Sequence, residues 1–148
     1  MSSSETRQAP APAAGRRVLL VVDDEQLNRD ILKRLFYTQF EIIEAPDGLA
    51  AQKVLEERPI DVIISDHLMP GMSGAELARV AHSRFAETVM LLLTGYDDDP
   101  LVTTASREGA IFEVVAKPWQ MKPLKDAVAR AIAERDRRLA AVAPPVSS

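Results

Sequence analysis

Short apolar runs alternate along the chain with stretches whose apolar residues recur at helical spacing. The apolar runs predict strands at residues 18–22, 40–44, 61–65, 89–93 and 111–115. The amphipathic stretches predict helices at residues 25–37, 48–58, 74–84, 100–108 and 123–141. The pattern therefore predicts five strand–helix units in succession.

Cap residues mark where several of these helices begin and end. Asp47 is placed to cap the second helix, and Pro59 ends it. Asp99 followed by Pro100 is typical of an N-cap and a first-turn proline, and Gly109 is typical of a helix end. The run of acids at residues 97–99 is therefore interpreted as a loop and a cap rather than as a metal cluster.

The strands are apolar throughout rather than alternating. Such strands, separated by amphipathic helices, are typical of a parallel sheet that helices cover on both faces. The predicted fold class is α/β, with a five-stranded parallel sheet and right-handed crossovers. In such sheets a ligand site lies beyond the carboxyl ends of the strands, where the strand order reverses.

The two ends of the chain differ from this pattern. Residues 1–15 are rich in Ser, Ala and Pro and show no periodicity, and residues 142–148 are similar. We expect both to be disordered tails, which leaves a single domain at residues 16–141.

Composition narrows the classes of function. A net charge of −4 argues against nucleic acid as a direct partner. The chain has no cysteine, which excludes disulfides and Cys-ligated zinc and fits a reducing cytoplasm. The longest apolar runs are far shorter than the ~20 residues of a membrane span, so no membrane location is expected.

Polar side chains follow four of the five predicted strands. Asp23 and Asp24 follow the first strand, Asp66 the third, Thr94 the fourth and Lys117 the fifth. Because the carboxyl ends of parallel strands meet at one edge, we expect these groups to gather there. Clustered carboxylates repel one another and favour a divalent cation. Oxygen ligands without His or Cys favour Mg²⁺, or Mn²⁺, and Mg²⁺ readily shares a phosphate oxygen.

These motifs together resemble the receiver domain of two-component response regulators. They are the acidic pair Asp23-Asp24, the segment DHLMPGMSG that begins at Asp66, Thr94 after strand four and Lys117-Pro118 after strand five. The resemblance covers roughly residues 17–133. It implies a flavodoxin-like sheet with strand order 2-1-3-4-5 and a site between strands one and three.

The resemblance also implies roles for individual residues. Asp66 is expected to accept a phosphoryl group from a sensor histidine kinase, a phosphotransfer protein or a small phosphodonor. Asp24, Asp66 and the backbone carbonyl of Leu68 would bind Mg²⁺ directly, and Asp23 would act mostly through water. Lys117 and Thr94 would contact the phosphoryl group. The Lys117–Pro118 bond is expected to be cis, and no small-molecule turnover is expected.

Some positions depart from the receiver pattern. Val114 stands where receivers commonly carry Tyr or Phe, the aromatic half of their conformational switch. Phe112 is two residues earlier and, by alternation, is expected on the same strand face. Leu68 and Tyr96 stand where receivers border the path of the hydrolytic water; both are bulky, and neither is an acid or an amide that could orient water. A long-lived phosphoryl group is therefore predicted.

Three alternative functions share some of these features. A metal-dependent phosphatase of the haloacid-dehalogenase kind also forms an aspartyl-phosphate, but it has Asp-x-Asp after its first strand. A nucleotide-binding module would carry a glycine-rich phosphate loop, and none follows the first strand. A pseudo-receiver that is never phosphorylated would not need the complete acidic set.

The remaining predictions concern single residues and the last helix. His67 should point away from the site and be structural or exposed, and Trp119 should pack under the last helix. In that helix Leu124, Val128, Ala131 and Ile132 should face the sheet. Residues 134–138 are expected past the edge of the domain. There, with the face of the fourth helix and fifth strand, they would join two copies in a phosphorylation-dependent homodimer.

Overall fold

The computed structural model describes residues 16–95 and 99–142. Strands and helices alternate in chain order. The strands are β2 (Arg17–Val22), β3 (Phe40–Ala45), β4 (Val62–Asp66), β5 (Val89–Thr94) and β6 (Glu113–Ala116). The helices are α1 (Gln26–Phe36), α2 (Gly48–Glu57), α3 (Gly74–Arg84), α4 (Pro100–Arg107) and α5 (Met121–Val142).

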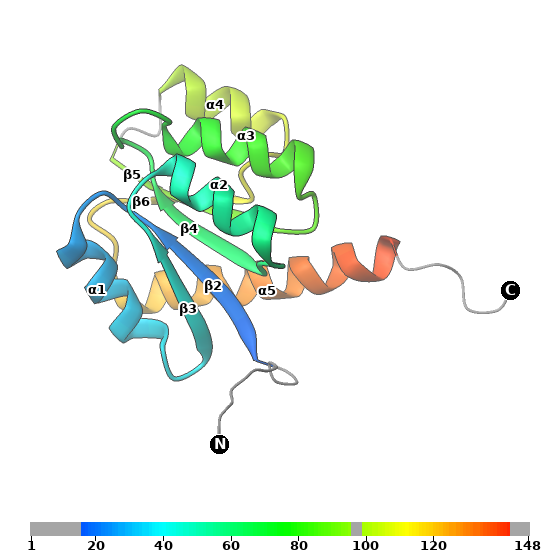
Figure 1. The fold of residues 1–148 in the computed structure, drawn as a ribbon, viewed down its shortest axis with the longest axis horizontal. Helices are drawn as coiled ribbons and strands as arrows, with labels where there is room; N and C mark the ends of the chain where they lie inside the picture. The colour runs from blue at the N-terminus through cyan, green and yellow to red at the C-terminus, as the bar shows by residue number, and fades with distance from the viewer. Residues whose placement is uncertain (1–15, 96–98, 143–148) are drawn as a thin grey trace, which may run out of the picture.

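The five strands form one parallel sheet in the order β3-β2-β4-β5-β6. Numbered along the chain, this is the predicted order 2-1-3-4-5. Figure 1 shows α1 and α5 on one face of the sheet and α2, α3 and α4 on the other. The predicted α/β fold class and topology are therefore confirmed.

A separate apolar core fills each side of the sheet. On the side of α2, α3 and α4, β-strand residues such as Leu20 and Ile63 pack with Leu77 and Ala78. On the other side Leu19, Val21 and Ile64 pack with residues from α1 and α5. The central strands β2, β4 and β5 are buried on both faces, which explains why they carry no polar alternation.

The caps predicted from the sequence are present. The Asp47 side chain accepts a hydrogen bond from the Ala50 N–H at the start of α2. Asp99 accepts one from the Leu101 N–H, with Pro100 in the first turn of α4. Asp97 and Asp98, assigned to the same loop, lie outside the described residues, as do the predicted tail at residues 1–15 and residues 143–148.

Helix α1 buries only part of its apolar surface. Leu32 and Phe36 are the buried residues, four positions apart, and Phe36 packs edge-on against Phe40. Leu27 and Ile31 are 69% and 44% exposed. The apolar face of α1 is therefore wider than the face that the sheet covers, and part of it meets solvent.

Helix α5 follows the prediction in its first half. Leu124, Val128 and Ala131 are buried, and Ile132 packs against the same core. Trp119, just before the helix, packs against this core as well.

Residues 134–138 of α5, which were expected past the edge of the domain, contact the rest of the domain instead. Arg135 is buried and forms an ion pair with Asp61, and Asp136 pairs with Arg17. The Arg138 guanidinium donates hydrogen bonds to the carbonyls of Ala86 and Thr88, each at 3.1 Å. These contacts hold the helix against the amino-terminal edge of the sheet, so Arg135 and Asp136 are engaged within the chain.

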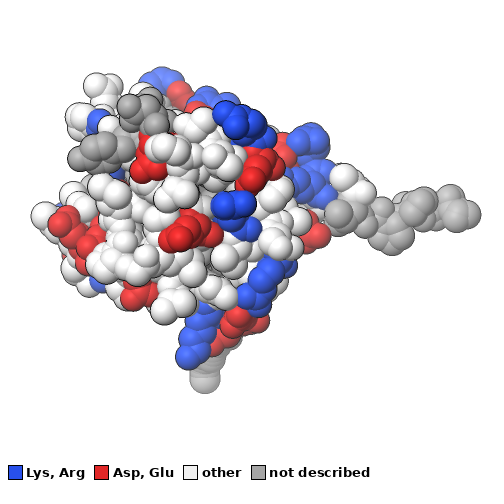
Figure 2. Space-filling model, turned by 90° about the horizontal axis from the view of Figure 1, so that it is seen from above, with Lys and Arg blue, Asp and Glu red and all other residues white. Residues whose placement is uncertain are grey.

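The surface carries both signs of charge. Figure 2 shows Lys and Arg interspersed with Asp and Glu on the face formed by α2, α3 and α4, with no large basic patch on that face. None of the described helices has both the length and the apolar character needed to cross a membrane.

Candidate functional site

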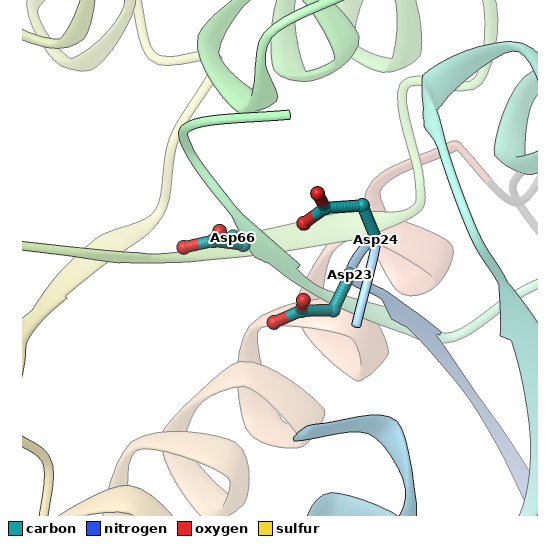
Figure 3. Close-up of side chains that lie close together, drawn as sticks. All are labelled: Asp23, Asp24 and Asp66. Atoms are coloured by element: carbon teal, nitrogen blue, oxygen red, sulfur yellow. The ribbon is translucent and has the colours of Figure 1, made fainter. Parts of the chain in front are cut away.

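Three carboxylates meet at the carboxyl edge of the sheet. Asp23 and Asp24 follow β2, and Asp66 is the last residue of β4. One oxygen from each lies within 4.8 Å of the others. Figure 3 shows all three carboxylates pointing to the same side, beyond the strand ends. Among the described residues, this is the group of acidic side chains that could hold a metal ion.

The register of the strands explains why Asp23 and Asp66 lie close together. β2 and β4 are neighbours in the sheet, and Val22 is paired with Ser65. The next residue along each strand is therefore an aspartate, and the two leave the sheet side by side. Backbone contacts fix both positions: the Asp23 N–H donates to the Ala45 carbonyl at 3.2 Å, and Asp66 is paired with Leu93 of β5.

Asp23 is the carboxylate that the protein shields most from water. It is 3% exposed, and burial raises the pKa of its carboxyl above the ordinary value. The Glu25 N–H, 2.9 Å away, opposes this rise, and the nearby charge of Asp66 adds to it. An ionised Asp23 is thus held at some cost in free energy, which a bound cation would relieve.

Two residues of α1 position Asp23, and the sequence patterns did not single them out. The Asn28 amide donates to both Asp23 carboxylate oxygens, at 3.3 and 3.4 Å. The Arg29 guanidinium donates to the Asp23 backbone carbonyl at 2.7 Å and pairs with Glu44. Their place in the first turn of a helix that starts just after the acidic pair is a signal that could have identified them.

Lys117 forms an ion pair with Asp66 across the strand ends. The Lys117 N–H also donates to the Thr94 carbonyl at 3.0 Å, which ties the two strand ends together. Thr94 itself is buried at the end of β5. The Lys117–Pro118 peptide bond is cis, as expected. Asp66, Lys117 and Thr94 thus come from three adjacent strands to one edge of the sheet.

The turn after Asp66 is closely packed. The Gly74 N–H donates to the His67 carbonyl at 2.8 Å, and a Cβ on Gly74 would lie 2.4 Å from the Asp66 carbonyl oxygen. Gly71 has φ +79°, a conformation that suits glycine. The Leu68 side chain is 56% exposed beside the site. Only glycine at 74 allows α3 to begin so near to the end of β4.

A hollow of about 530 Å³ opens next to the carboxylates. It is lined by residues of α1 and by the segment after β6, namely Asp23, Asn28, Ile31, Leu32, Leu93, Lys117, Pro118 and Trp119. Its walls are largely apolar, while Asp23 and Lys117 lie at its polar end. A side chain from a partner can therefore approach the site from this direction.

One expectation about the last strand is wrong. Val114 packs against the core on the side of α2, α3 and α4, whereas Phe112 packs against the core on the side of α1 and α5. The alternation does not extend to Phe112 because β6 begins only at Glu113. Phe112 therefore offers no aromatic group on the face of Val114.

The donor set suits a hard divalent cation. The three side chains offer carboxylate oxygens only, which are ligands that Mg²⁺ and Mn²⁺ accept. Burial of Asp23 and its repulsion by Asp66 give a physical reason for a cation there. These residues therefore fit the metal expected from the sequence.

The comparisons with known proteins agree with this geometry. Residues 19–129 match the response regulator receiver domain. The chain therefore belongs to the response regulator receiver family.

Among curated proteins, the chain is similar to transcriptional regulators. It is 32% identical to the hydrogenase transcriptional regulatory protein HoxA of Cupriavidus necator, over 77% of this chain and 24% of HoxA. It is 33% identical to the response regulator protein FleR of Pseudomonas aeruginosa, over 77% of this chain and 24% of FleR. The chain thus spans about a quarter of the length of these relatives.

Solved structures show the same fold. The signal receiver domain of an HD domain-containing protein from Pseudomonas fluorescens superposes with a TM-score of 0.79 and 28% identity, covering 88% of this chain and 97% of that one. The response regulator TrrA of Thermotoga maritima, solved in complex with Mg²⁺ and beryllofluoride, has a TM-score of 0.68 and 32% identity, with 78% and 98% covered.

Proposed function

We propose that Asp66 is the phosphoacceptor, and that it takes its phosphoryl group from a sensor histidine kinase or a phosphotransfer protein. The observation that carries this proposal is the placing of Asp66 at the end of a central strand, within the carboxylate cluster and paired with Lys117. Asp24 is exposed, whereas Asp23 and Asp66 are buried.

The reaction is a transfer of a phosphoryl group to a carboxylate. An Asp66 oxygen forms a bond to phosphorus while the bond between phosphorus and the donor imidazole nitrogen breaks, and the electron pair leaves with the imidazole. The product is an acyl phosphate. Lys117 pairs with Asp66 before the transfer and is placed to balance the charge of the phosphoryl oxygens after it. Thr94 supplies a hydroxyl from the neighbouring strand.

Asp24, Asp66 and the Leu68 carbonyl would hold Mg²⁺ directly, and Asp23 would act through water. When bound, the metal neutralises charge on the transferring group. The complex of TrrA with Mg²⁺ and beryllofluoride supports this assignment, since that relative is 32% identical to the chain. Mn²⁺ fits the same oxygen ligands.

The partner kinase would dock over α1. Leu27 and Ile31 are exposed there, and Ile31 lines the hollow that leads to Asp23 and Lys117. Exposed apolar side chains next to a reactive carboxylate suit a protein surface that presents a phosphohistidine. This proposal gives a reason for the wide apolar face of α1.

No turnover of a small molecule is proposed for this chain. A cyclic di-GMP phosphodiesterase of Thermotoga maritima is 29% identical, but the match covers only 31% of that protein. The haloacid-dehalogenase alternative is not favoured, because the candidate nucleophile follows the third strand of the chain rather than the first.

The output of the signal is a further proposal. Relatives such as HoxA are named as transcriptional regulators, but the match covers a quarter of their length. The phosphorylation-dependent homodimer stays a prediction, now confined to the face of α4 and β6, because Arg135 and Asp136 are engaged within the chain. Light scattering with and without beryllofluoride and Mg²⁺ tests it, and a monomer in both states would contradict it.

Incubation with acetyl phosphate and Mg²⁺ tests the proposed function. We expect wild type to gain the mass of one phosphoryl group and Asp66→Asn to gain none. Chelation of the metal should prevent the gain in wild type. Hydrolysis of a generic phosphate ester with multiple turnovers would instead support the phosphatase.

A further inference from the structure

A buried histidine lies directly after the proposed phosphoacceptor and contacts the start of α4. The His67 side chain is 2% exposed, and its Nε2 lies 3.2 Å from Oδ2 of Asp99. Asp99 is the N-cap of α4, and its other oxygen, Oδ1, accepts the Leu101 N–H at 2.8 Å. One carboxylate thus joins the first turn of α4 to the residue after Asp66.

The direction of this hydrogen bond follows from the charge of Asp99. The Leu101 N–H, and then His67, hold the pKa of the Asp99 carboxyl below its ordinary value. An ionised carboxylate accepts hydrogen bonds and donates none, so Nε2 of His67 carries the donated hydrogen. The histidine end is fixed, because the His67 N–H donates to the Leu93 carbonyl and its carbonyl accepts from the Gly74 N–H.

Helix α4 is short and weakly held. It has eight residues, and the side chains that it buries are those of Val102 and Ala105. Isolated helices of this length are marginal, so the position of α4 depends on its few tertiary contacts. The hydrogen bond to His67 at its N-terminus is therefore one of a small set of contacts that position it.

The hydrogen-bonding capacity of the His67 side chain is only partly used. Nδ1 of His67 is buried and has no hydrogen-bond partner among the residues that the structure describes. A buried polar atom without a partner offsets part of the gain from the Nε2 bond. A link of this kind can be broken by a modest change in free energy, which suits a switch better than a permanent anchor.

We propose that His67 is a positioning residue whose bond to Asp99 holds α4 in the arrangement of the unphosphorylated protein, so that charge added at Asp66 and the position of α4 are coupled through it. The inference rests on the proposed function. Val114 leaves the face of β6 without the aromatic side chain common in receivers. The hydrogen bond between His67 and Asp99, here called the link, gives the chain another connection between α4 and β4, the strand that carries the proposed phosphoacceptor.

The test uses beryllofluoride with Mg²⁺ as a stable mimic of the phosphoryl group. Two variants break the link by different means. His67→Leu removes the imidazole and fills the buried space. Asp99→Ser keeps an N-cap for α4, but its shorter side chain cannot reach His67. Asp99→Asn keeps both the cap and an acceptor. Asp47→Ser is the matched control, since Asp47 caps α2 in the same way and is not part of the link.

We expect His67→Leu and Asp99→Ser each to bind the mimic about two- to tenfold more tightly, the size of one net hydrogen bond. The double variant should bind no more tightly than either single variant. Asp99→Asn and Asp47→Ser should match wild type. In the free variants, the amide resonances of Val102 and Ala105 should move toward their positions in wild type bound to the mimic.

Unchanged or weaker binding in both link variants, or gains that add in the double variant, would overturn the link while leaving the proposed function intact. Failure of wild type to bind the mimic would overturn the proposed function and this inference with it. If His67→Leu does not fold, the comparison of Asp99→Ser with Asp99→Asn decides the matter, because Asp99 is at the surface.

Discussion

The Nε of Arg135 lies 3.0 Å from Oδ1 of Asp61, and the two side chains are only 10% and 16% exposed. The other Asp61 oxygen accepts the Val18 N–H at 2.8 Å, at the start of the first strand. Arg135→Met should lower the free energy of unfolding by about 2 kcal/mol, because Asp61 would be left mostly buried with only the more distant Arg17, at 3.9 Å, as a partner charge. Urea unfolding measures this loss of stability, and the m-value should be the same for the variant and the wild type.

The control is Arg130→Met. Arg130 pairs with Glu113 at 2.6 Å, but its side chain is 54% exposed, and such pairs contribute at most about 1 kcal/mol. Equal losses in the two variants would mean that the second half of α5 is not anchored as described.

Gly74→Ala should disturb the site through the backbone. The added Cβ would lie 2.4 Å from the Asp66 carbonyl oxygen and 2.9 Å from the His67 Cα, so α3 or the strand end must shift. We expect a loss of about 1–3 kcal/mol in stability and slower phosphorylation by acetyl phosphate. Gly95→Ala is the control, because no other atom of the described residues lies within 4 Å of a Cβ there. A fully stable Gly74→Ala with wild-type kinetics would contradict this packing.

Asp23→Asn should stabilise the protein in the absence of metal. The raised pKa of Asp23 means that its ionised form is less favourable in the folded state than in the unfolded state. Removal of that charge should raise stability at neutral pH by about 1 kcal/mol, and the gain should shrink as pH falls from the raised pKa toward the ordinary value of 3.8. Mg²⁺ should raise the Tm of the wild type by binding to the folded state, and this rise should be smaller or absent in Asp23→Asn.

Thermal unfolding of both proteins across this pH range, with and without Mg²⁺, provides the measurement. A less stable Asp23→Asn in the absence of metal would show that the Glu25 and Asn28 hydrogen bonds outweigh the cost of burial.

Leu68 and Tyr96 predict a long-lived phosphoryl group. The Leu68 side chain is exposed beside the site and cannot orient water, and Tyr96 lies outside the described residues. Leu68→Asn combined with Tyr96→Glu should shorten the lifetime, because polar groups can orient an attacking water. Decay of the phosphorylated protein after removal of the donor measures this. A rate that is unchanged or slower would refute the prediction.

The sequence predicted the sheet and its polar edge because both depend on local patterns. Continuous apolar runs define buried parallel strands, and the residue after each run must lie at the carboxyl edge. The neighbours of Asp23 were harder to predict. Asn28 and Arg29 look like ordinary polar residues of a helix until the direction of α1 relative to β2 is known.

Contacts between residues that are far apart in the sequence were also not predicted. Arg135 and Asp61 are far apart in the sequence, so their spacing gives no sign that they meet. The same holds for His67 and Asp99, where the sequence predicted only that His67 points away from the site. Phe112 was placed on the wrong face because alternation was applied before the strand begins at Glu113.

The most direct test of the central claim is to find where the chain is phosphorylated. Wild type is treated with acetyl phosphate and Mg²⁺, and intact mass and then peptide mapping locate the added group. We expect one phosphoryl group, on the peptide that carries Asp66, and none in Asp66→Asn or after chelation. A phosphoryl group on another residue, or an unmodified wild type under conditions in which a known receiver is modified, would contradict the account.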